Sequence, residues 1–242
     1  MQKIEWHGRT DVGLIRPNNE DTYLIDPDCS YCLVADGMGG AAAGETASQI
    51  FAQSAKEMLC NNGSLTDQQV VDRVHTVFRT ANERILAHVV RHPDHHGMGC
   101  TAELLAFTAS GFIIGHIGDS RTYRLRQGVL KQLTKDHSLV QEQIDQGLIT
   151  PEQARSHKMR NIILRAVGVK PSPSLDILRG PIFSGDIFLL CSDGLTDMVE
   201  DSKISSILEG RDSVQLKVEA LVESAKEAGG KDNITVVLSE IK

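Results

Sequence analysis

Short apolar strands that lead directly into an aspartate and then a small residue recur along this chain of 242 residues. The aspartates are Asp36, Asp119 and Asp193, and each follows a run of apolar residues. A single aspartate after a strand is an ordinary turn residue. Packed sheets, however, present the ends of their strands at shared edges. The recurrence therefore predicts that these carboxylates converge on one rim of the fold.

Two more acidic segments lie next to predicted strands. Asn19-Glu20-Asp21 precedes a strand at 22–26, and Asp232-Asn233 opens a strand at Ile234–Ile241. With the three aspartates above, these segments make six carboxylates, which would repel one another by several kcal/mol at an effective dielectric of about 20. They stay ionised together only with cations among them. Oxygen ligands without Cys or His favour Mg²⁺, Mn²⁺ or Ca²⁺ over zinc.

The order of the predicted elements favours an α+β fold. Apolar residues at 3.6-residue spacing predict helices at 44–60, 66–91 and 213–228. Further strands are predicted at 31–35, 101–108, 112–117, 122–126 and 187–191. Consecutive helices between groups of strands disagree with a regular βαβ alternation and suit antiparallel sheets covered by helices. The length suits one domain over residues 1–242.

The stretch at about 138–168 has a different character from its surroundings. A short helix ends at Gly147, and Thr150-Pro151 then provides a second helix start with proline at the first position. Few long apolar residues occur before Ile162. We therefore expect a small subdomain inserted near the surface.

Composition excludes several classes of protein. Lys and Arg number 25 against 32 Asp and Glu, a net charge of −7, which is a poor match for nucleic acids or an anionic membrane. The apolar runs are too short to span a bilayer, and the first ten residues lack the apolar core of a secretory signal. The odd count of five cysteines is most simply explained by reduced thiols in the cytoplasm.

The acidic segments together resemble a known family. They are Arg16-Pro17-Asn18-Asn19-Glu20-Asp21, Val34-Ala35-Asp36-Gly37-Met38-Gly39-Gly40, Gly118-Asp119-Ser120-Arg121, Ser192-Asp193-Gly194 and Lys231-Asp232-Asn233. In kind and order they resemble the metal-dependent serine/threonine protein phosphatases of type 2C, the PPM family, as does the segment 161–168. The resemblance runs from about Gly8 to the last strand, and the size fits a free-standing bacterial-type catalytic domain.

The resemblance implies a central antiparallel β-sandwich with helices on both outer faces and a flap at 138–168. It also implies two Mg²⁺ or Mn²⁺ ions at one end of the sandwich. Asp36 would bridge the two ions, and Asp193 and Asp232 would complete one site. The carbonyl of Gly37, with Glu20 acting largely through water, would serve the other.

Further roles follow from the same resemblance. Asp119, together with Asp193, would hold a weaker third ion. Arg16 would grip the substrate phosphate, because a planar guanidinium can make two hydrogen bonds to it. The catalytic set would be Asp36, Asp193 and Arg16. The supporting residues would be Asp21, Asn233 and Ser192.

The implied activity is hydrolysis of phosphoserine and phosphothreonine in proteins, in opposition to a serine/threonine kinase. A water bridging the two cations would attack phosphorus in line, without a covalent phospho-enzyme. We expect a cytoplasmic monomer with no nucleic-acid or membrane partner. Two alternatives stay open: an inactive phosphoprotein-binding regulatory module on the same fold, and a metal-dependent hydrolase of a small phosphorylated metabolite.

The general acid is unassigned, because two positions depart from the family pattern. Many eukaryotic relatives have His at the position of Met38, and many bacterial relatives have His at the position of Ala41. His137 is a candidate for the missing acid, although a structural role at the base of the insertion is the preferred interpretation. Cys29 and Cys32 have CxxC spacing, but no second pair accompanies them, so we expect small hairpin residues rather than a redox or zinc site.

Overall fold

Two antiparallel sheets packed face to face form the centre of the protein, which is described by a computed structural model over residues 3–39, 43–60 and 65–242. One sheet has the order β1 (Ile4–Asp11), β11 (Ile234–Ile241), β10 (Ile187–Cys191), β7 (Arg121–Arg126) and β8 (Val129–Gln132). The other has the order β2 (Asp21–Asp26), β3 (Tyr31–Met38), β5 (Ala102–Phe107), β6 (Phe112–Ile117) and β9 (Asp176–Gly180). The short β4 (Gly99–Cys100) pairs with the end of β3.

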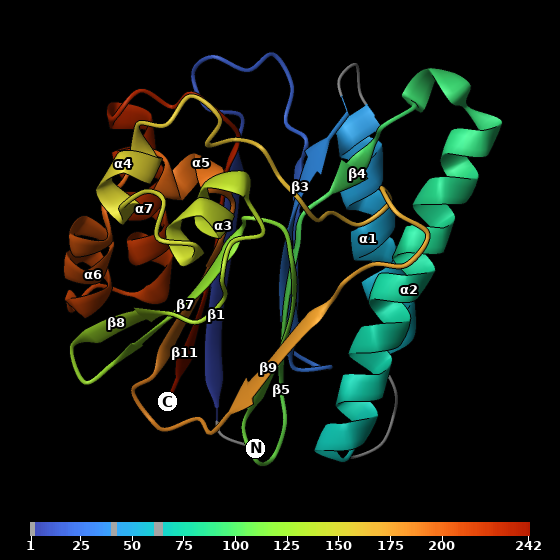
Figure 1. Ribbon diagram of the computed structural model, residues 1–242. Helices are drawn as coiled ribbons and strands as arrows, with labels where there is room; N and C mark the ends of the chain where they lie inside the picture. Colours follow the sequence, from blue (N-terminus) through green and yellow to red (C-terminus); the bar gives the residue numbers. More distant parts are fainter. Residues whose placement is uncertain (1–2, 40–42, 61–64) are drawn as a thin grey trace.

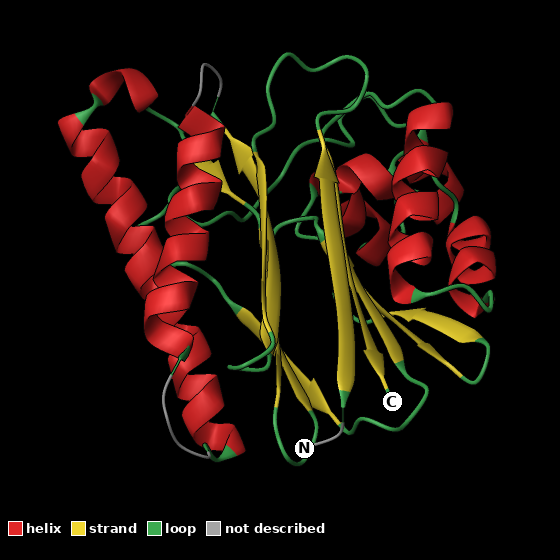
Figure 2. Ribbon diagram, turned by 180° about the vertical axis from the view of Figure 1, so that it is seen from behind, coloured by secondary structure: helices red, strands yellow, loops and turns green. Residues whose placement is uncertain are grey.

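Helices cover the outer face of each sheet (Figures 1 and 2). The long helices α1 (Ala43–Leu59) and α2 (Asp67–Arg91) lie on the β3 sheet, and the one-turn η1 (Pro93–His95) follows α2. The β11 sheet is covered by α5 (Asp193–Thr196), α6 (Asp201–Glu209) and α7 (Val214–Glu227). The predicted α+β sandwich with helices on both outer faces is confirmed.

Alternation of side chains along the strands produces these layers. In β3, Tyr31 and Leu33 point into the core beneath α1 and α2, whereas Cys32 and Val34 point into the core between the sheets. All four side chains are fully buried. A strand buried on both faces reads as a continuous apolar run, which is why it was visible in the sequence.

The predicted strands and long helices are all present, with ends within a few residues of those expected. Thr66 and Gln69 form a capping box at the start of α2. Strands β1, β4, β8 and β9 were not predicted, and in β1 it is Gly8 that interrupts the alternation. Glycine is needed there, since a Cβ at Gly8 would lie 2.7 Å from the ring of Tyr23 on the facing sheet.

The segment predicted as an insertion holds α3 (Leu139–Asp145) and α4 (Pro151–Arg155). Its base is tied to the body because Leu164 donates a backbone hydrogen bond to the His137 carbonyl at 2.7 Å. Its tip is joined to the body by ion pairs, Arg160 with Asp197 at 3.1 Å and Arg155 with Glu200.

The expectation of five reduced thiols is wrong for one pair. Cys29, after β2, and Cys60, after α1, are joined by a disulfide. Cys32, Cys100 and Cys191 are free and buried. The CxxC spacing of Cys29 and Cys32 is therefore coincidental, because the two side chains lie on different sides of the hairpin. Within the described ranges, no helix is both long and apolar enough to cross a membrane.

A buried ion pair joins the neighbouring strands β5 and β6. Glu103 and His116 lie opposite each other, and the His116 Nδ1 contacts the Glu103 carboxylate. Thr122 donates to the other oxygen of Glu103 at 2.5 Å, and the His116 Nε2 donates to the Lys135 carbonyl at 2.8 Å. Burial alone would lower the pKa of His116, but the Glu103 carboxylate outweighs burial and raises it to about 9.

The stability that this pair contributes is present below about pH 6.5 and is lost as pH rises through about 9. We expect the wild type to lose roughly 3 kcal/mol more than the Glu103→Gln/His116→Gln double variant between about pH 7 and 10. Urea unfolding at each pH measures this difference. His75→Gln, at an exposed histidine on α2, should keep the wild-type slope. Parallel slopes for the wild type and the double variant would contradict the prediction.

Candidate metal centre

The ends of the two sheets meet at Asp21. In the β2–β3 ladder Asp21 lies directly opposite Asp36. From the other sheet, the Ser192 and Thr235 hydroxyls donate to Asp21 Oδ2 at 2.8 and 2.6 Å. Ser192 directly precedes Asp193, so these hydrogen bonds bring the carboxylates that end β3 and β10 to one rim.

Asn233 holds the loop that carries Arg16 and Glu20 against this rim. Its Oδ1 accepts the backbone N–H of Glu20 at 2.8 Å, and its Nδ2 donates to the carbonyls of Val12 and Asn18 at 3.1 and 2.9 Å. The buried amide is therefore fully engaged in shaping the loop. The same loop brings the Arg16 guanidinium to Asp232, with Nη2 2.6 Å from Oδ2.

A cleft of about 360 Å³ lies between these elements. Most of the predicted site residues line it, namely Arg16, Glu20, Asp36, Gly37, Asp193, Asp232 and Asn233. Asp119 instead lines a neighbouring cleft with Asp197, Arg160 and Arg121. Asp193 and Asn161 line both clefts, so Asp119 lies on the far side of Asp193 from the main group.

Close packing positions the backbone at Gly37. Its N–H donates to the Glu20 carbonyl at 3.2 Å, and that carbonyl also accepts from the Ser48 hydroxyl at 2.7 Å. A Cβ at Gly37 would lie 2.1 Å from the carbonyl oxygen of Gly44. Glycine is therefore required for the start of α1 to approach the end of β3 this closely.

The acidic side chains in and beside the clefts have raised pKa values, because they are buried and close to one another. Burial, and then the carboxylates of Asp21, Asp193 and Asp119, raise the pKa of Asp36 well above its usual value. Burial and the neighbouring acids likewise raise the pKa of Asp193, and burial followed by Asp136 raises that of Asp119 to about 7. Burial raises the pKa of Asp21 to about 6, although the hydrogen bonds from Thr235 and Ser192 lower it. Without cations, each of these groups therefore binds a proton more readily than an isolated aspartate does.

Carboxylate oxygens that have no hydrogen-bond partner indicate whether the cluster is suited to binding cations. Asp119 Oδ1 and Asp193 Oδ1 are buried without a hydrogen-bond partner, as is Asp21 Oδ1. Orphaned buried acceptors are rare in folded proteins and call for an explanation. Hard divalent cations supply one, because they bind carboxylate oxygens and neutralise the mutual repulsion. The donor set therefore fits Mg²⁺ or Mn²⁺.

His137 does not face the main cleft. The ring Nδ1 of His137 accepts the Gly118 backbone N–H at 3.1 Å, and the backbone N–H of His137 donates to the Gly118 carbonyl at 2.7 Å. Burial, together with His116, lowers the pKa of His137 to about 4. This geometry favours the structural role, in which His137 fixes the turn before Asp119. Met38 lines the cleft, and Ala41 lies outside the described residues.

Some residues of the site escaped sequence reasoning. Thr235 is a fully buried donor to Asp21, and its only signal was a hydroxyl among the apolar residues of β11. Asn161 and Ile163 belong to the segment 161–168 that resembles the family, but the sequence assigned them no role at the site, and both line the same cleft. They come from the 138–168 segment, whose position over the body no local pattern could reveal.

Comparison with known proteins agrees with this arrangement. A profile of the family described as protein phosphatase 2C matches residues 17–238. The serine/threonine protein phosphatase PstP of Mycobacterium tuberculosis is 38% identical over 239 residues, which is 98% of this chain but 45% of that protein. The chain thus spans about half the length of this relative. The serine/threonine phosphatase stp of Listeria monocytogenes is 36% identical over 236 residues, or 96% of this chain and 94% of that protein.

Solved structures show the same likeness. The crystal structure of M. tuberculosis PstP has a TM-score of 0.90 at 38% identity and covers 99% of both chains. The catalytic domain of PstP in complex with two manganese ions has a TM-score of 0.90 at 36% identity and covers 98% of both. Sequence, fold and the acidic rim therefore agree, and the chain belongs to the protein phosphatase 2C family.

Proposed function

We propose that this protein is a metal-dependent phosphatase that acts on phosphoserine and phosphothreonine in proteins. The observation that carries the proposal is the group of carboxylates at one rim of the fold, where one buried oxygen each of Asp21, Asp119 and Asp193 lacks a hydrogen-bond partner. Of the relatives that the chain covers almost completely, one is named a serine/threonine phosphatase and another a protein phosphatase. An inactive binding module would have no need for an intact set of mutually repelling acids.

The proposed ligands follow the cleft. Asp36 would bridge two cations, with Asp193 and Asp232 on one side and the Gly37 carbonyl and Glu20 on the other. A weaker third cation would bind Asp119 and Asp193 in the neighbouring cleft. When bound, two divalent cations neutralise the charge of a phosphate and lower the pKa of a water held between them. The cations would be Mg²⁺ or Mn²⁺, as the donor set favours both.

Arg16 has the geometry of a phosphate ligand. Its side chain is 49% exposed at the mouth of the cleft and makes one strong contact, to Asp232. A guanidinium can pair with two phosphate oxygens at once. Arg16 would thus orient the substrate and stabilise charge on the equatorial oxygens during in-line attack. Asp21, Ser192 and Asn233 would hold the ligands in place without touching the substrate.

The substrate class follows from the surroundings of the cleft. We propose a single domain over 1–242 in which the 138–168 segment acts as a flap beside the cleft, and that the cleft takes a phosphorylated segment of a protein. A cytoplasmic monomer opposing a serine/threonine kinase is the simplest setting. A dedicated hydrolase of a small metabolite is not favoured, because the cleft is lined by acids and by few groups that would recognise a particular small molecule.

Hydrolysis of a phosphothreonine peptide should require added Mn²⁺ or Mg²⁺ and should stop in excess chelator. The reason is that the acidic cleft repels a phosphate dianion unless cations neutralise it. Release of inorganic phosphate measures the rate, and a metabolite panel at equal concentration separates the two substrate classes. Full turnover in excess chelator, or a strong preference for one metabolite, would refute the proposal.

Asp193→Asn should separate metal binding from folding. In chelator, we expect the variant to unfold at the same or a higher temperature than the wild type, because one repelling charge has been removed. Saturating Mn²⁺ should raise the wild-type Tm by roughly 5–10 °C and the variant's by much less. Asp94→Asn, at an exposed acid after α2, is the control and should respond like the wild type. An unchanged Mn²⁺ response in Asp193→Asn would contradict the ligand assignment.

Arg16→Ala should lower kcat/KM for the phosphopeptide by roughly 10- to 100-fold, since a hydrogen bond to a charged group contributes about 1.5–3 kcal/mol. Because the ion pair of Arg16 with Asp232 is partly exposed and such pairs contribute little to stability, the Tm in chelator should change little. Arg91→Ala, on the exposed end of α2, is the matched control. Wild-type kinetics for Arg16→Ala would remove Arg16 from the phosphate site.

A further inference from the structure

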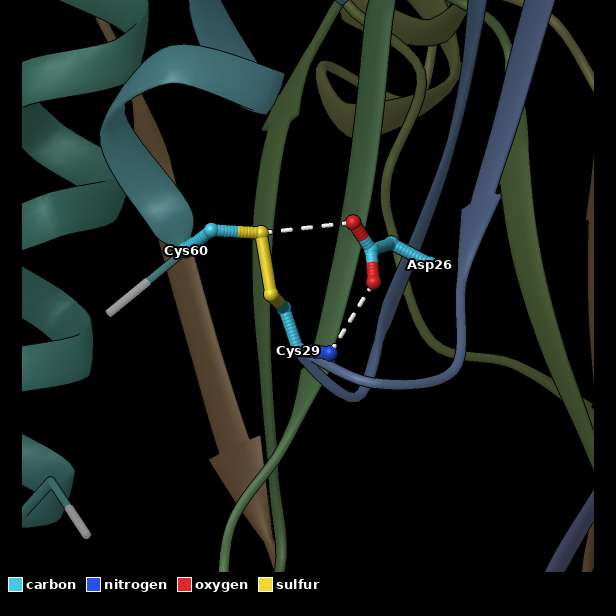
Figure 3. Close-up of side chains that lie close together, drawn as sticks. All are labelled: Asp26, Cys29 and Cys60. Carbon is cyan, nitrogen blue, oxygen red and sulfur yellow. Dashed lines mark hydrogen bonds between the residues drawn. A yellow bond between two sulfur atoms is a disulfide. The ribbon is translucent and has the colours of Figure 1, made fainter. Parts of the chain in front are cut away.

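Cys29 and Cys60 join two elements that are far apart in sequence. Cys29 lies in the turn between β2 and β3, and Cys60 directly follows α1, 31 residues later. Their Cα atoms are 5.4 Å apart, which is within the usual range for a disulfide. Figure 3 shows the bond between the two sulfurs, next to the carboxylate of Asp26.

The turn is shaped so that it presents Cys29 to the helix. Asp26 Oδ1 accepts the backbone N–H of Cys29 at 3.0 Å, and Ser30 adopts a left-handed conformation with φ of 55°. The other oxygen of Asp26 lies 3.3 Å from the sulfur of Cys60 (Figure 3). Asp26 thus contacts both halves of the cross-link and positions the turn against the end of α1.

Exposure distinguishes this pair from the other cysteines. Cys60 is exposed and Cys29 is half-buried, whereas Cys32, Cys100 and Cys191 are fully buried. Burial also raises the pKa of the three free thiols, to about 12 for Cys32 and further for the other two, which keeps them unreactive. The Cys29–Cys60 bond is therefore the one redox group in the described part of the chain that a soluble thiol or disulfide can reach.

From this placement we propose that Cys29 and Cys60 form a reversible redox cross-link that staples the far end of α1 to the β2–β3 turn. The oxidant is a small-molecule disulfide, RSSR. The Cys60 thiolate attacks one sulfur and releases the first thiol, RSH. The Cys29 thiolate then attacks the Cys60 sulfur of the mixed disulfide and releases the second. The two cysteines lose two electrons and two protons, and RSSR becomes two RSH.

The cross-link lies at the end of α1 that is remote from the carboxylate cleft. At the other end, a Cβ on Gly44 would lie 2.7 Å from Gly37, and Ser48 bonds the Glu20 carbonyl. The 17 residues of α1 span about 25 Å. Reduction therefore releases the far end while the contacts at the cleft remain. Arg73 continues to hold the Leu59 carbonyl at 3.0 Å, so the helix keeps a non-covalent anchor.

Thiol counting and thermal unfolding test the cross-link without any activity measurement. Under native conditions, a maleimide should label no cysteine in the oxidised protein and two after reduction. Equilibration in mixtures of oxidised and reduced glutathione should interconvert the two forms. Reduction should lower the Tm by roughly 5–10 °C, since the bond closes a loop of about 30 residues. Hydrogen exchange should rise near 52–59 upon reduction and stay unchanged at 43–48.

The Cys29→Ser/Cys60→Ser variant is the control for both measurements. Its Tm should match that of the reduced wild type and should not respond to reductant, whereas Cys191→Ala should keep the response. Labelling of both cysteines in glutathione-oxidised protein, or a reductant effect that persists in the double serine variant, would overturn the proposal. Stoichiometric Zn²⁺ bound by the reduced protein and lost in the double variant would also overturn it, because the two thiolates and Asp26 would then be a metal site.

Discussion

Repulsion between neighbouring carboxylates is the constraint around which this protein is organised. Asp36 and Asp193 end strands of different sheets, yet the charge of Asp193 contributes to the raised pKa of Asp36, and both acids are raised by Asp119, Asp21 and Asp232. Such a group is unfavourable by itself and becomes favourable when divalent cations occupy it. The same repulsion that destabilises the cation-free rim therefore supplies its attraction for metal ions. Perturbed acids of this kind gather at functional sites for that reason.

Neutral donors, rather than opposite charges, hold the rim in shape. Ser192 and Thr235 donate to Asp21, and the Asn233 amide bonds only backbone groups. Neutral donors fix the position of a carboxylate without cancelling its charge. The negative potential of the cleft is thereby preserved for cations. Arg16 is the exception among the residues that line the cleft, and it is half-exposed at the mouth, where a substrate phosphate would arrive.

Helix α1 connects the rim with the cystine at its far end. Near the cleft it is held by close backbone packing and one hydroxyl, and at the far end by a covalent bond. The two kinds of anchor respond to different conditions, since packing is insensitive to thiols and the disulfide is not. A single helix can thus be fastened more or less firmly by the redox environment while its contacts at the acidic rim persist.

The sequence by itself determined the fold class and the acidic residues of the site. Buried strands such as β3 and amphipathic helices such as α2 are predicted from the local pattern of apolar residues. The aspartates at strand ends predict a shared edge. Tertiary structure alone decided what depends on distance across the fold. These features are all long-range contacts. Thr235 bonds Asp21, Asn161 lines the cleft, Asp119 lies beyond Asp193, and Cys29 pairs with Cys60 rather than with Cys32. Packing sets them, and periodicity along the chain contains no record of which distant surfaces will meet.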